Sequence, residues 1–437
     1  MPDWFYRTVS QPVLFRLPGV TARAIALGIM GWLARLPLGA AVIDFMGHMR
    51  ADQRLRCTHL GIEFPTAIGL GPGLDVHAIA LPALGRFGVG FLEVGPVTLK
   101  GHVADQRLER RPDEEAIWLP DPPESLSLDA VAPRLAEASR LGLPLVARLG
   151  YRAGANAHQS ADDCRRVING LAPHVRFFSL LTLPLAVADG WSMEQWATHV
   201  QTIVDVGKAA SRPVILCVPC DLEPARADPM IEAALSSGVA GLLVEGSVRA
   251  PTGGRLIGLP ACALALARVR DLRQRHGSPL LLIAFGGVHE PVDALLLRRA
   301  GADLVQVDSG LVYAGPGLPK RINEALLFEA THSASALSPL PGNEEATRPA
   351  AMSWFWTFLM GAGMMFGSVL AMVIAATRVV LPYDEAFLGM SRAELMQVNP
   401  RLLPFMAHDR VCLAGTMIAI GVMYVGLSLY GVRRGLH

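Results

Sequence analysis

Lysine is nearly absent from this chain of 437 residues: only Lys100, Lys208 and Lys320 occur, and arginine supplies the rest of the positive charge. The 39 basic residues are balanced by 38 acidic ones, so the formal net charge is +1. Without a basic surplus the chain cannot neutralise a run of phosphates, and we therefore expect no nucleic-acid partner. Few amines are left for lysine-based chemistry.

Cysteine is also scarce. The six cysteines lie far apart, without the spacing of a disulfide framework, which favours a reducing compartment for the main domain. Cys217 and Cys220 form the motif CVPC, for which a redox or metal role is the alternative. No second C-x-x-C motif supplies further ligands. We therefore predict no metal site and place both cysteines in and just after a buried strand.

Long charge-free runs are confined to the C-terminal end. Residues 354–376 and 411–432 are each long enough to cross a bilayer, and buried core helices are the alternative. Arg433 and Arg434 follow the second run, which favours a cytoplasmic C-terminus at the cell (inner) membrane, with the main domain on the same side. The small residues of GAGMMFGS in the first run would let a helix of a membrane protein partner approach. Residues 1–7 do not resemble a cleavable signal peptide.

Composition divides the chain into four segments. Residues 1–56 mix arginine with large apolar side chains at helical spacing, which predicts an amphipathic helical cap. Residues 57–330 form the main domain, and residues 331–352 have the composition of a linker. Residues 353–437 are predicted to form a transmembrane hairpin with a connecting loop.

Eight short apolar runs alternate with helix-period segments in the main domain. The runs lie at 67–71, 90–97, 144–150, 176–183, 213–219, 241–246, 280–287 and 303–310. Apolar strands separated by helices indicate a parallel sheet covered by helices. Eight such units in one α/β domain predict a (β/α)8 TIM barrel, and a doubly wound open sheet is the alternative.

Glycines follow the seventh and eighth predicted strands, where barrels of this kind often hold a phosphate. Gly286 and Gly287 come after the seventh, and Ser309 and Gly310 after the eighth. Glycine lets backbone N–H groups approach an anion, and the serine hydroxyl adds a donor. The alternative is that these glycines only form tight turns.

Ionisable residues at other strand ends are candidates for catalysis. His77, Arg148 and Glu245 follow the first, third and sixth predicted strands. A role in proton transfer or in binding an anionic group is one interpretation. The alternative is a buried ion-paired network of Arg148, Glu245 and Asp308 that fills the barrel mouth.

Two stretches of the main domain match a known pattern. The first is GIEFPTAIGLGPGLDVHAIALPALGRFGVGFLEVGPVT, and the second runs from TGGRLIGLP to LVYAGPGLPKRINEAL. They resemble the dihydroorotate dehydrogenase family, in its quinone-linked, membrane-associated class, over about residues 57–330. The resemblance implies a flavoprotein barrel that holds FMN, oxidises dihydroorotate to orotate in pyrimidine biosynthesis and passes electrons to a membrane quinone. The cofactor residues that we assign are Gly73, Gly258, Gly286, Gly287, Ser309 and Gly310.

The family's catalytic positions differ in this chain. Its two flavin lysines correspond to Val76 and Cys217, and its serine base corresponds to Leu183. Asp308 stands where the family often has tyrosine. The chain has five asparagines, none at a strand end where the family binds substrate, and the corresponding residues include Arg148, Leu180 and Leu185. Loss of a positioned base alone lowers a rate by a factor of about 100 to 10,000.

These differences lead us to predict a membrane-attached, non-catalytic or ligand-binding derivative (a pseudoenzyme) that keeps a phosphate or FMN site. The alternative is an FMN-dependent oxidoreductase that passes electrons to a membrane quinone from dihydroorotate or another substrate. In that alternative Arg148 would hold an anionic group and His77 or Glu245 would move a proton.

Overall fold

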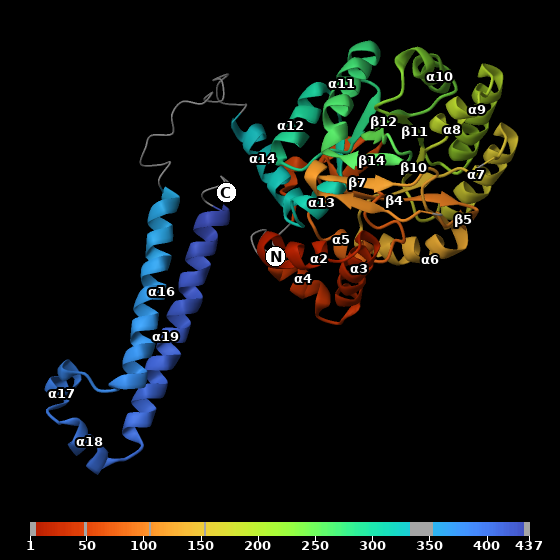
Figure 1. Cartoon of the computed structure of the whole chain (residues 1–437). Helices are drawn as coiled ribbons and strands as arrows, with labels where there is room; N and C mark the ends of the chain where they lie inside the picture. The colour runs from red at the N-terminus through yellow and green to blue at the C-terminus, as the bar shows by residue number, and fades with distance from the viewer. Residues whose placement is uncertain (1–5, 48–49, 105, 153, 333–352, 432–437) are drawn as a thin grey trace. The chain divides into compact units, whose positions relative to one another are not determined.

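The computed structural model describes residues 6–47, 50–104, 106–152, 154–332 and 353–431. The chain divides into two compact units, Met1–Ala336 and Leu337–His437 (Figure 1). The first unit contains the residues predicted to form the cap and the barrel. The second contains those predicted to form the membrane hairpin.

Eight parallel strands form a closed barrel in the first unit (Figure 1). Around the barrel they follow the order β3-β4-β9-β10-β11-β12-β15-β16, and β16 pairs with β3 to close the ring. Their bounds are β3 (Ile68–Leu70), β4 (Phe91–Thr98), β9 (Leu145–Leu149), β10 (Phe177–Leu180), β11 (Val214–Pro219), β12 (Gly241–Glu245), β15 (Leu281–Phe285) and β16 (Leu304–Val307). Every strand falls within its predicted apolar run except for the last residue of β4, and the TIM-barrel prediction is confirmed.

Helices follow the strands and cover the outside of the barrel. They are α5 (Leu81–Leu84), α6 (Leu128–Ala138), α7 (Ala157–Leu171), α8 (Leu183–Ala188), α9 (Met193–Ala209), α10 (Pro224–Ser236), α11 (Leu259–His276), α12 (Pro291–Ala300), α13 (Ser309–Tyr313) and α14 (Leu318–His332). Single-turn 3-10 segments lie at Gln53–Leu55 (η2), Pro112–Glu114 (η3) and Ser139–Leu141 (η4). Reciprocal caps fix where two long helices begin: Asn156 with Gln159 for α7, and Ser192 with Gln195 for α9.

Short strands that the sequence did not predict close both ends of the barrel. At the N-terminal end β1 (Cys57–His59) and β2 (Ile62–Phe64) form an antiparallel hairpin. Its Phe64 is 1% exposed and packs against Phe91 and Phe177, with ring centroids 5.5 and 6.5 Å away. Beyond the opposite end a four-stranded sheet forms from β6 (Glu109–Arg111), β7 (Ala116–Leu119), β13 (Ser247–Arg249) and β14 (Arg255–Gly258). Two more strands, β5 (Lys100–His102) and β8 (Ser125–Ser127), extend the sheet beside β4.

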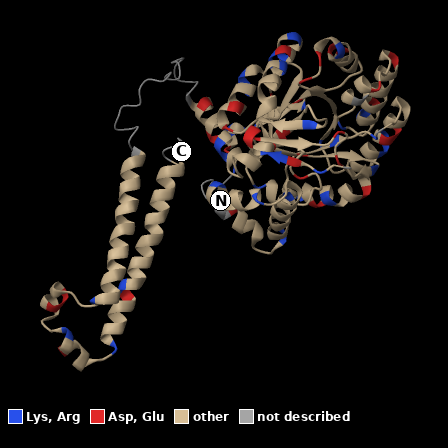
Figure 2. Ribbon diagram, in the orientation of Figure 1, with Lys and Arg blue, Asp and Glu red and all other residues tan. Residues whose placement is uncertain are grey.

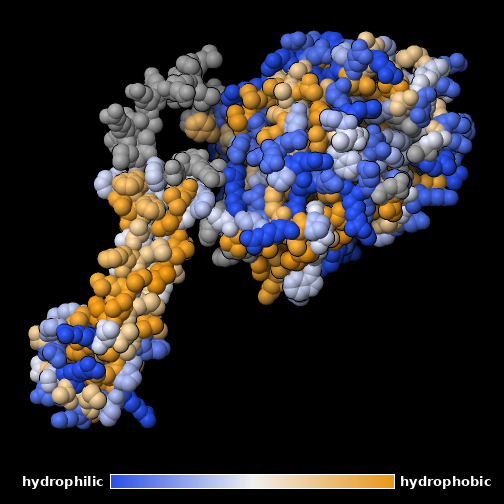
Figure 3. Space-filling view, in the orientation of Figure 1, coloured by the Kyte–Doolittle hydropathy of each residue, from blue (hydrophilic) through white to orange (hydrophobic). Residues whose placement is uncertain are grey.

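The predicted cap consists of short helices that pack on the barrel. They are η1 (Tyr6–Ser10), α2 (Gln11–Phe15), α3 (Gly19–Arg35) and α4 (Gly39–Gly47). Helix α3 buries Ala22 and Leu27, whereas Ile29 and Trp32 are 58% and 63% exposed. Apolar side chains therefore also reach the outer surface of the cap (Figure 3).

Two long helices pack side by side in the second unit (Figure 1). They are α16 (Ser353–Thr377) and α19 (Leu402–Gly426), which continues as η5 (Leu427–Gly431); α17 (Pro382–Leu388) and α18 (Arg392–Val398) connect them. Charged residues are absent from α16 and gather toward the connecting helices (Figure 2), and the pair has an apolar surface (Figure 3). Residues Trp354–Thr377 and Leu402–Gly431 are long and apolar enough to cross a membrane.

Glycines set the close contact between these two helices. A Cβ on Gly361 would lie 2.8 Å from the carbonyl oxygen of Gly421, so both residues must be small there. Gly363 and Gly367 have no atom of the described residues within 4 Å of such a Cβ. The partner helix expected at the GAGMMFGS segment stays a prediction. Helix α14 runs two residues into the predicted linker, whose remaining residues, 333–352, lie outside the described residues.

Candidate functional site

A cavity of about 380 Å³ opens at the C-terminal end of the barrel, the end where barrel enzymes carry their active sites. Its floor includes Arg148, Glu245 and Phe285, which lie at or near the ends of three barrel strands, and its roof includes Arg23 of α3. His77, from the segment after β3, lies at the rim. The three predicted catalytic residues, His77, Arg148 and Glu245, therefore line one cavity.

A buried network of charged and polar side chains lies beneath the cavity floor. The Arg148 guanidinium donates to both carboxylate oxygens of Glu93, at 2.9 and 3.1 Å, and both side chains are at most 3% exposed. Ser179 and Gln306 also donate to Glu93. Glu245 lies 3.7 Å from the other terminal nitrogen of Arg148. A buried ion pair with this many hydrogen bonds is a fixed part of the barrel core.

This network differs from the one expected from the sequence. Arg148 and Glu245 are paired as expected, but Asp308 does not join them, and Glu93 is the carboxylate that holds Arg148. Glu93 lies on β4, directly beside β9, which carries Arg148. A carboxylate within an otherwise apolar barrel strand was the signal that could have identified it, because such a buried charge needs a partner.

Arg148 is the positive charge at the cavity floor. Burial alone would lower the pKa of its guanidinium, but the Glu93 carboxylate beside it raises that pKa above its ordinary value. Its carbon Cζ lies 5.3 Å from the ring centroid of Phe285. Arg148 therefore stays charged, and its charge is opposed by two carboxylates, those of Glu93 and Glu245.

Asp308 forms a separate contact at the junction of β16 and β3. Its carboxylate accepts a hydrogen bond of 2.8 Å from the backbone N–H of Gly73. A Cβ on Gly73 would lie 2.5 Å from the same carboxylate, so a larger residue at this position would displace the Asp308 side chain. Burial raises the pKa of the Asp308 carboxyl to about 7. Near neutral pH this side chain is therefore neutral in a large fraction of molecules.

The predicted phosphate loops pack closely against each other and their neighbours. Gly286 and Gly287 have φ of 100° and 75°, values that favour glycine. A Cβ on Gly286 would lie 2.3 Å from the carbonyl oxygen of Gly246, and one on Gly310 would lie 2.0 Å from that of Val288. Backbone packing alone thus requires these glycines, as the tight-turn alternative expects.

The same loops leave backbone donors without partners. Among the described residues, the N–H groups of Gly286 and Gly287 form no hydrogen bond. Ser309 and Gly310 begin α13, and the first N–H groups of a helix have no partner within the helix. Four backbone donors are therefore available around one place, which is what an anion site needs.

A chain of hydrogen bonds that sequence analysis missed supports Ser309. Its hydroxyl lies 2.9 Å from Nε2 of His289, and Nδ1 of His289 lies 2.9 Å from a carboxylate oxygen of Glu115. Tyr313 stacks on the His289 ring, with centroids 5.5 Å apart and planes 20° apart. A Cβ on Gly258 would lie 2.4 Å from the Glu115 carbonyl oxygen, so the predicted cofactor residue Gly258 borders the same chain.

His77 links the rim of the cavity to the cap. Its Nε2 lies 3.1 Å from one carboxylate oxygen of Glu124, and Arg23 of α3 donates to the other oxygen at 3.2 Å. The hydrogen bond from His77, together with Arg23, lowers the pKa of Glu124. The His77 side chain is 42% exposed, so it reaches both solvent and the cavity rim.

The end of β10 brings no base into the cavity. Leu181 is the residue of this segment that lines the cavity, and Leu183 is fully buried. The hydroxyl of Ser179 on β10 donates to Glu93, and that of Thr182 lies 3.1 Å from Nε2 of His199 on α9. Burial lowers the pKa of His199 to about 4, and the imidazole sits among helices outside the barrel. The Thr182–His199 pair is therefore structural.

Cys217 and Cys220 occupy the positions predicted for them. Cys217 lies within β11 and Cys220 directly after it, and both are buried and free. Burial raises the pKa of each thiol to about 12, so neither is a thiolate at neutral pH. No group of three or more potential metal ligands occurs among the described residues.

Arg110 anchors the cap helices to the sheet above the barrel. Its guanidinium donates to the carbonyl oxygens of Leu14, at 3.0 Å, and Leu17, and its Cζ lies 4.5 Å from the Phe15 ring centroid. Tyr6 adds a 2.8 Å hydrogen bond to the carbonyl oxygen of Val312. The cap is thus fixed over the same end of the barrel as the cavity.

Comparisons with known proteins agree with this architecture. A family model described as dihydroorotate dehydrogenase matches residues 230–328. "Dihydroorotate dehydrogenase (quinone)" of Chloroflexus aurantiacus is 31% identical over 358 residues, covering 75% of this chain and 97% of the relative. The enzyme of the same name from Sphingopyxis alaskensis is 35% identical over 338 residues, covering 73% and 91%.

Solved structures show the same fold. Ligand-free dihydroorotate dehydrogenase from Eimeria tenella superimposes with a TM-score of 0.59 at 23% identity, covering 71% of this chain and 95% of that one. Its complex with ferulenol gives a TM-score of 0.59 at 22% identity. The sequence matches cover nearly the full length of the curated relatives, 97% and 91% for the two enzymes named above. The chain therefore belongs to the dihydroorotate dehydrogenase family.

Proposed function

We propose that this protein is a membrane-attached, FMN-dependent oxidoreductase that passes electrons from dihydroorotate or another small acid to a membrane quinone. The observation that carries the proposal is the cavity at the C-terminal end of the barrel, which is roofed by Arg23 of the cap and lined by Phe285, the residue directly before the unpaired backbone donors of Gly286 and Gly287. The relatives, which are named quinone-dependent dehydrogenases, favour this alternative over a non-catalytic derivative.

The residues around the phosphate loops suit the phosphate of FMN. The backbone N–H groups of Gly286, Gly287, Ser309 and Gly310 supply donors, and the Ser309 hydroxyl adds one more when Nε2 of His289 donates to its oxygen. A carboxylate close to a phosphate would repel it, but the Asp308 carboxyl has a pKa of about 7 and can be neutral. FMN held by these residues would supply the redox chemistry that links oxidation of a substrate to reduction of a quinone.

Arg148 is our candidate for the cation at the substrate end of the cavity. The family's flavin lysines are replaced by apolar or thiol side chains, and Arg148 is the charged nitrogen group on the cavity floor. Because Glu93 already holds its guanidinium in two places, Arg148 would orient a bound carboxylate without moving.

Glu245 is our candidate for the group that takes a proton from the substrate. It lines the cavity at the end of β12, its side chain is 12% exposed, and its contact with Arg148 is long at 3.7 Å. A carboxylate in such a position can accept a proton within the cavity. His77 at the rim would pass that proton to solvent.

The two apolar helices of the second unit support attachment to a membrane, where the quinone is dissolved. By the positive-inside rule the arginines after the second helix favour a barrel on the cytoplasmic side of the cell membrane. The exposed apolar residues of α3 would let the cap rest on the lipid surface.

The first test is the visible spectrum of the full-length protein purified in detergent, with chromatography of the released cofactor. We expect FMN, and then reduction of a soluble quinone when dihydroorotate is added. Glu245→Gln should keep the FMN and lower turnover by a factor of about 100 to 10,000. A protein that binds no FMN even when FMN is added in excess would contradict the proposal and leave the ligand-binding derivative as the function.

A further inference from the structure

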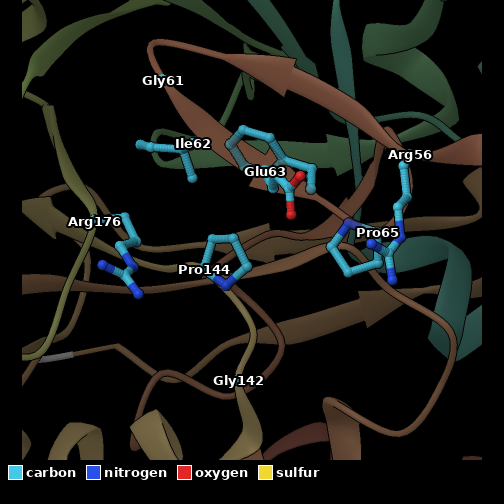
Figure 4. A pocket seen from close by; sticks show the side chains of 9 residues that line it. Arg56, Gly61, Ile62, Glu63, Pro65, Gly142, Pro144 and Arg176 are labelled. Carbon is cyan, nitrogen blue, oxygen red and sulfur yellow. The ribbon is translucent and has the colours of Figure 1, made fainter.

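Two adjoining clefts open at the N-terminal end of the barrel, opposite the site described above. The first, of about 430 Å³, lies under the β1–β2 hairpin and contains Arg56, Glu63 and Arg176 (Figure 4). Ile62 and Pro144 give it an apolar surface. A volume of this size suits a small-molecule ligand.

The second cleft continues from the first. It is also about 430 Å³ in volume and shares Ile62 and Arg176 with the first cleft. Lys208, from the last turn of α9, and Arg212, which precedes β11, add two more cations. Arg176 therefore stands between two positively charged spaces.

The charges around these clefts are unbalanced. Four basic side chains face one acidic side chain, Glu63, in a chain whose total charge is close to neutral. Within the described part of the chain, none of the four forms an ion pair; Arg212 donates only to backbone carbonyl oxygens. Nearby surface arginines are paired: Arg54 lies 2.9 Å from Asp52, and Arg273 lies 2.7 Å from Asp303. Clustered, unpaired cations create a field that attracts an anion.

The backbone that carries these cations is held by the barrel. Arg176 immediately precedes β10, and its N–H donates to the carbonyl oxygen of Leu145 at 2.8 Å. Arg56 immediately precedes β1, whose hairpin is anchored by the buried ring of Phe64. An anion would therefore meet a site already formed, without first ordering a loop.

We propose that the two clefts together bind a small, soluble phosphorylated molecule with at least two negative charges. One phosphate would lie against Arg176, which both clefts share, because a single guanidinium can donate two parallel hydrogen bonds to phosphate oxygens, and Arg56 would add its charge from the other side of the first cleft. A second anionic group would lie near Lys208 and Arg212, and the uncharged part would rest on Ile62 and Pro144. The site is independent of the flavin site, because the packed barrel core separates the two ends.

Glu63 gives the proposal a distinctive signature. Its carboxylate lies in the first cleft between the two arginines (Figure 4) and repels an incoming anion. Removing that charge should strengthen anion binding, whereas removing a charge from Arg56 or Arg176 should weaken it. A general loss of folding would weaken binding in every variant.

The experiment is calorimetric titration of the full-length protein with inorganic pyrophosphate at constant ionic strength. We expect a dissociation constant of about 1 mM or tighter for the natural chain. Arg176→Gln and Arg56→Gln should each weaken binding about tenfold, and Glu63→Gln should tighten it about threefold, in line with the usual strength of a charge-assisted hydrogen bond. Arg54→Gln is the matched control, because Arg54 is exposed, lies two residues from Arg56 and is already paired with Asp52. Pyrophosphate should bind to the Arg54→Gln variant as tightly as to the natural chain.

Three results would overturn the proposal. The first is no binding of pyrophosphate by the natural chain. The second is equal weakening in Arg54→Gln and Arg176→Gln, which would indicate a diffuse charge effect. The third is no gain of affinity in Glu63→Gln. Because the titration needs no flavin, its failure is distinct from failure of the proposed oxidoreductase function.

Discussion

Asp308 is the single residue whose charge state should most affect binding of the FMN phosphate at the proposed site. Its carboxyl is buried between β16 and β3, beside the loops proposed to hold phosphate, and its pKa is raised to about 7 by that burial. Protonation removes a negative charge from that position. FMN binding should therefore be stronger on the acidic side of neutrality than on the alkaline side.

Asp308 also makes the stability of the protein depend on pH. An aspartate has a pKa of about 3.9 when unfolded, so the folded chain holds a proton that the unfolded chain has lost between about pH 4 and 7. The stabilisation that protonated Asp308 contributes is fully present below about pH 4, near the pKa of aspartate in the unfolded chain. It is lost as the pH rises through about 7, the pKa of Asp308 in the folded chain. Asp308→Asn, which stays neutral, should be more stable than the natural chain at pH 8 by up to about 4 kcal/mol.

Urea unfolding of both proteins at pH 5 and pH 8 measures this difference. His199, whose pKa is lowered to about 4 by burial, has the opposite effect, since its unfolded form gains a proton below about pH 6.5. That effect is the same in both proteins and cancels in their difference. If the two proteins showed the same change between pH 5 and pH 8, Asp308 would be ionised in the folded chain at both.

His289 positions the Ser309 hydroxyl, and its role can be tested through the phosphate of the cofactor. With Nδ1 facing Glu115 and Nε2 facing Ser309, the imidazole fixes the direction in which the hydroxyl points. His289→Gln should weaken FMN binding about tenfold, the value of one hydrogen bond to a charged group, and leave riboflavin binding unchanged because riboflavin has no phosphate. Fluorescence titration of the apoprotein with both flavins measures this. Equal weakening of both would instead indicate a general distortion.

Sequence reasoning reached some of these residues and not others, for a physical reason. Arg148 and Glu245 could be assigned to one site because parallel strands bring their carboxyl ends to one edge. His289 and Glu115 are 174 positions apart and meet only because the β6–β7 segment folds back over the barrel. The separation of two residues along the sequence gives no information on such contacts.

At the scale of elements, the barrel strands were predictable and the segments that close the barrel were not. The barrel strands are predominantly apolar because both of their faces are covered, and the few polar side chains on them, such as Glu93 and Arg148, pair with one another. The hairpin strands β1 and β2 have three residues each, which is too short for a pattern of alternation to appear. Helix α3 was recognisable as amphipathic, but which barrel end it covers depends on contacts such as that of Arg23 with Glu124.

Arg110 fixes the position of the cap helices on the barrel. Arg110→Gln removes its hydrogen bonds to Leu14 and Leu17 and its contact with the Phe15 ring, and should destabilise docking of the cap by about 2 kcal/mol. We expect faster proteolysis within residues 6–47 and an unchanged unfolding midpoint for the barrel. Arg111→Gln is a suitable control, because Arg111 is an adjacent, exposed arginine that pairs only with Glu109 among the described residues. Similar proteolysis of both variants would show that Arg110 does not hold the cap.

The whole molecule joins two units of different surface chemistry. The first has a mixed polar surface and its own closed core, and the second presents apolar side chains along its two long helices (Figure 3). If the second unit serves to hold the barrel where quinone is dissolved, removal of the second unit should leave the flavin chemistry intact and lower the reduction of quinone in membranes.

A chain ending at Ala336, the limit of the first compact unit, tests this division of roles. We expect the full-length protein to stay with membranes after an alkaline wash and the shortened chain to be released, because it lacks both apolar helices. FMN content and reduction of a soluble electron acceptor should persist in the shortened chain, since the cavity and the phosphate loops lie entirely in the first unit. Reduction of membrane quinone should fall. A shortened chain that resists the wash would instead show that the exposed Ile29 and Trp32 of the cap bind the membrane strongly enough by themselves.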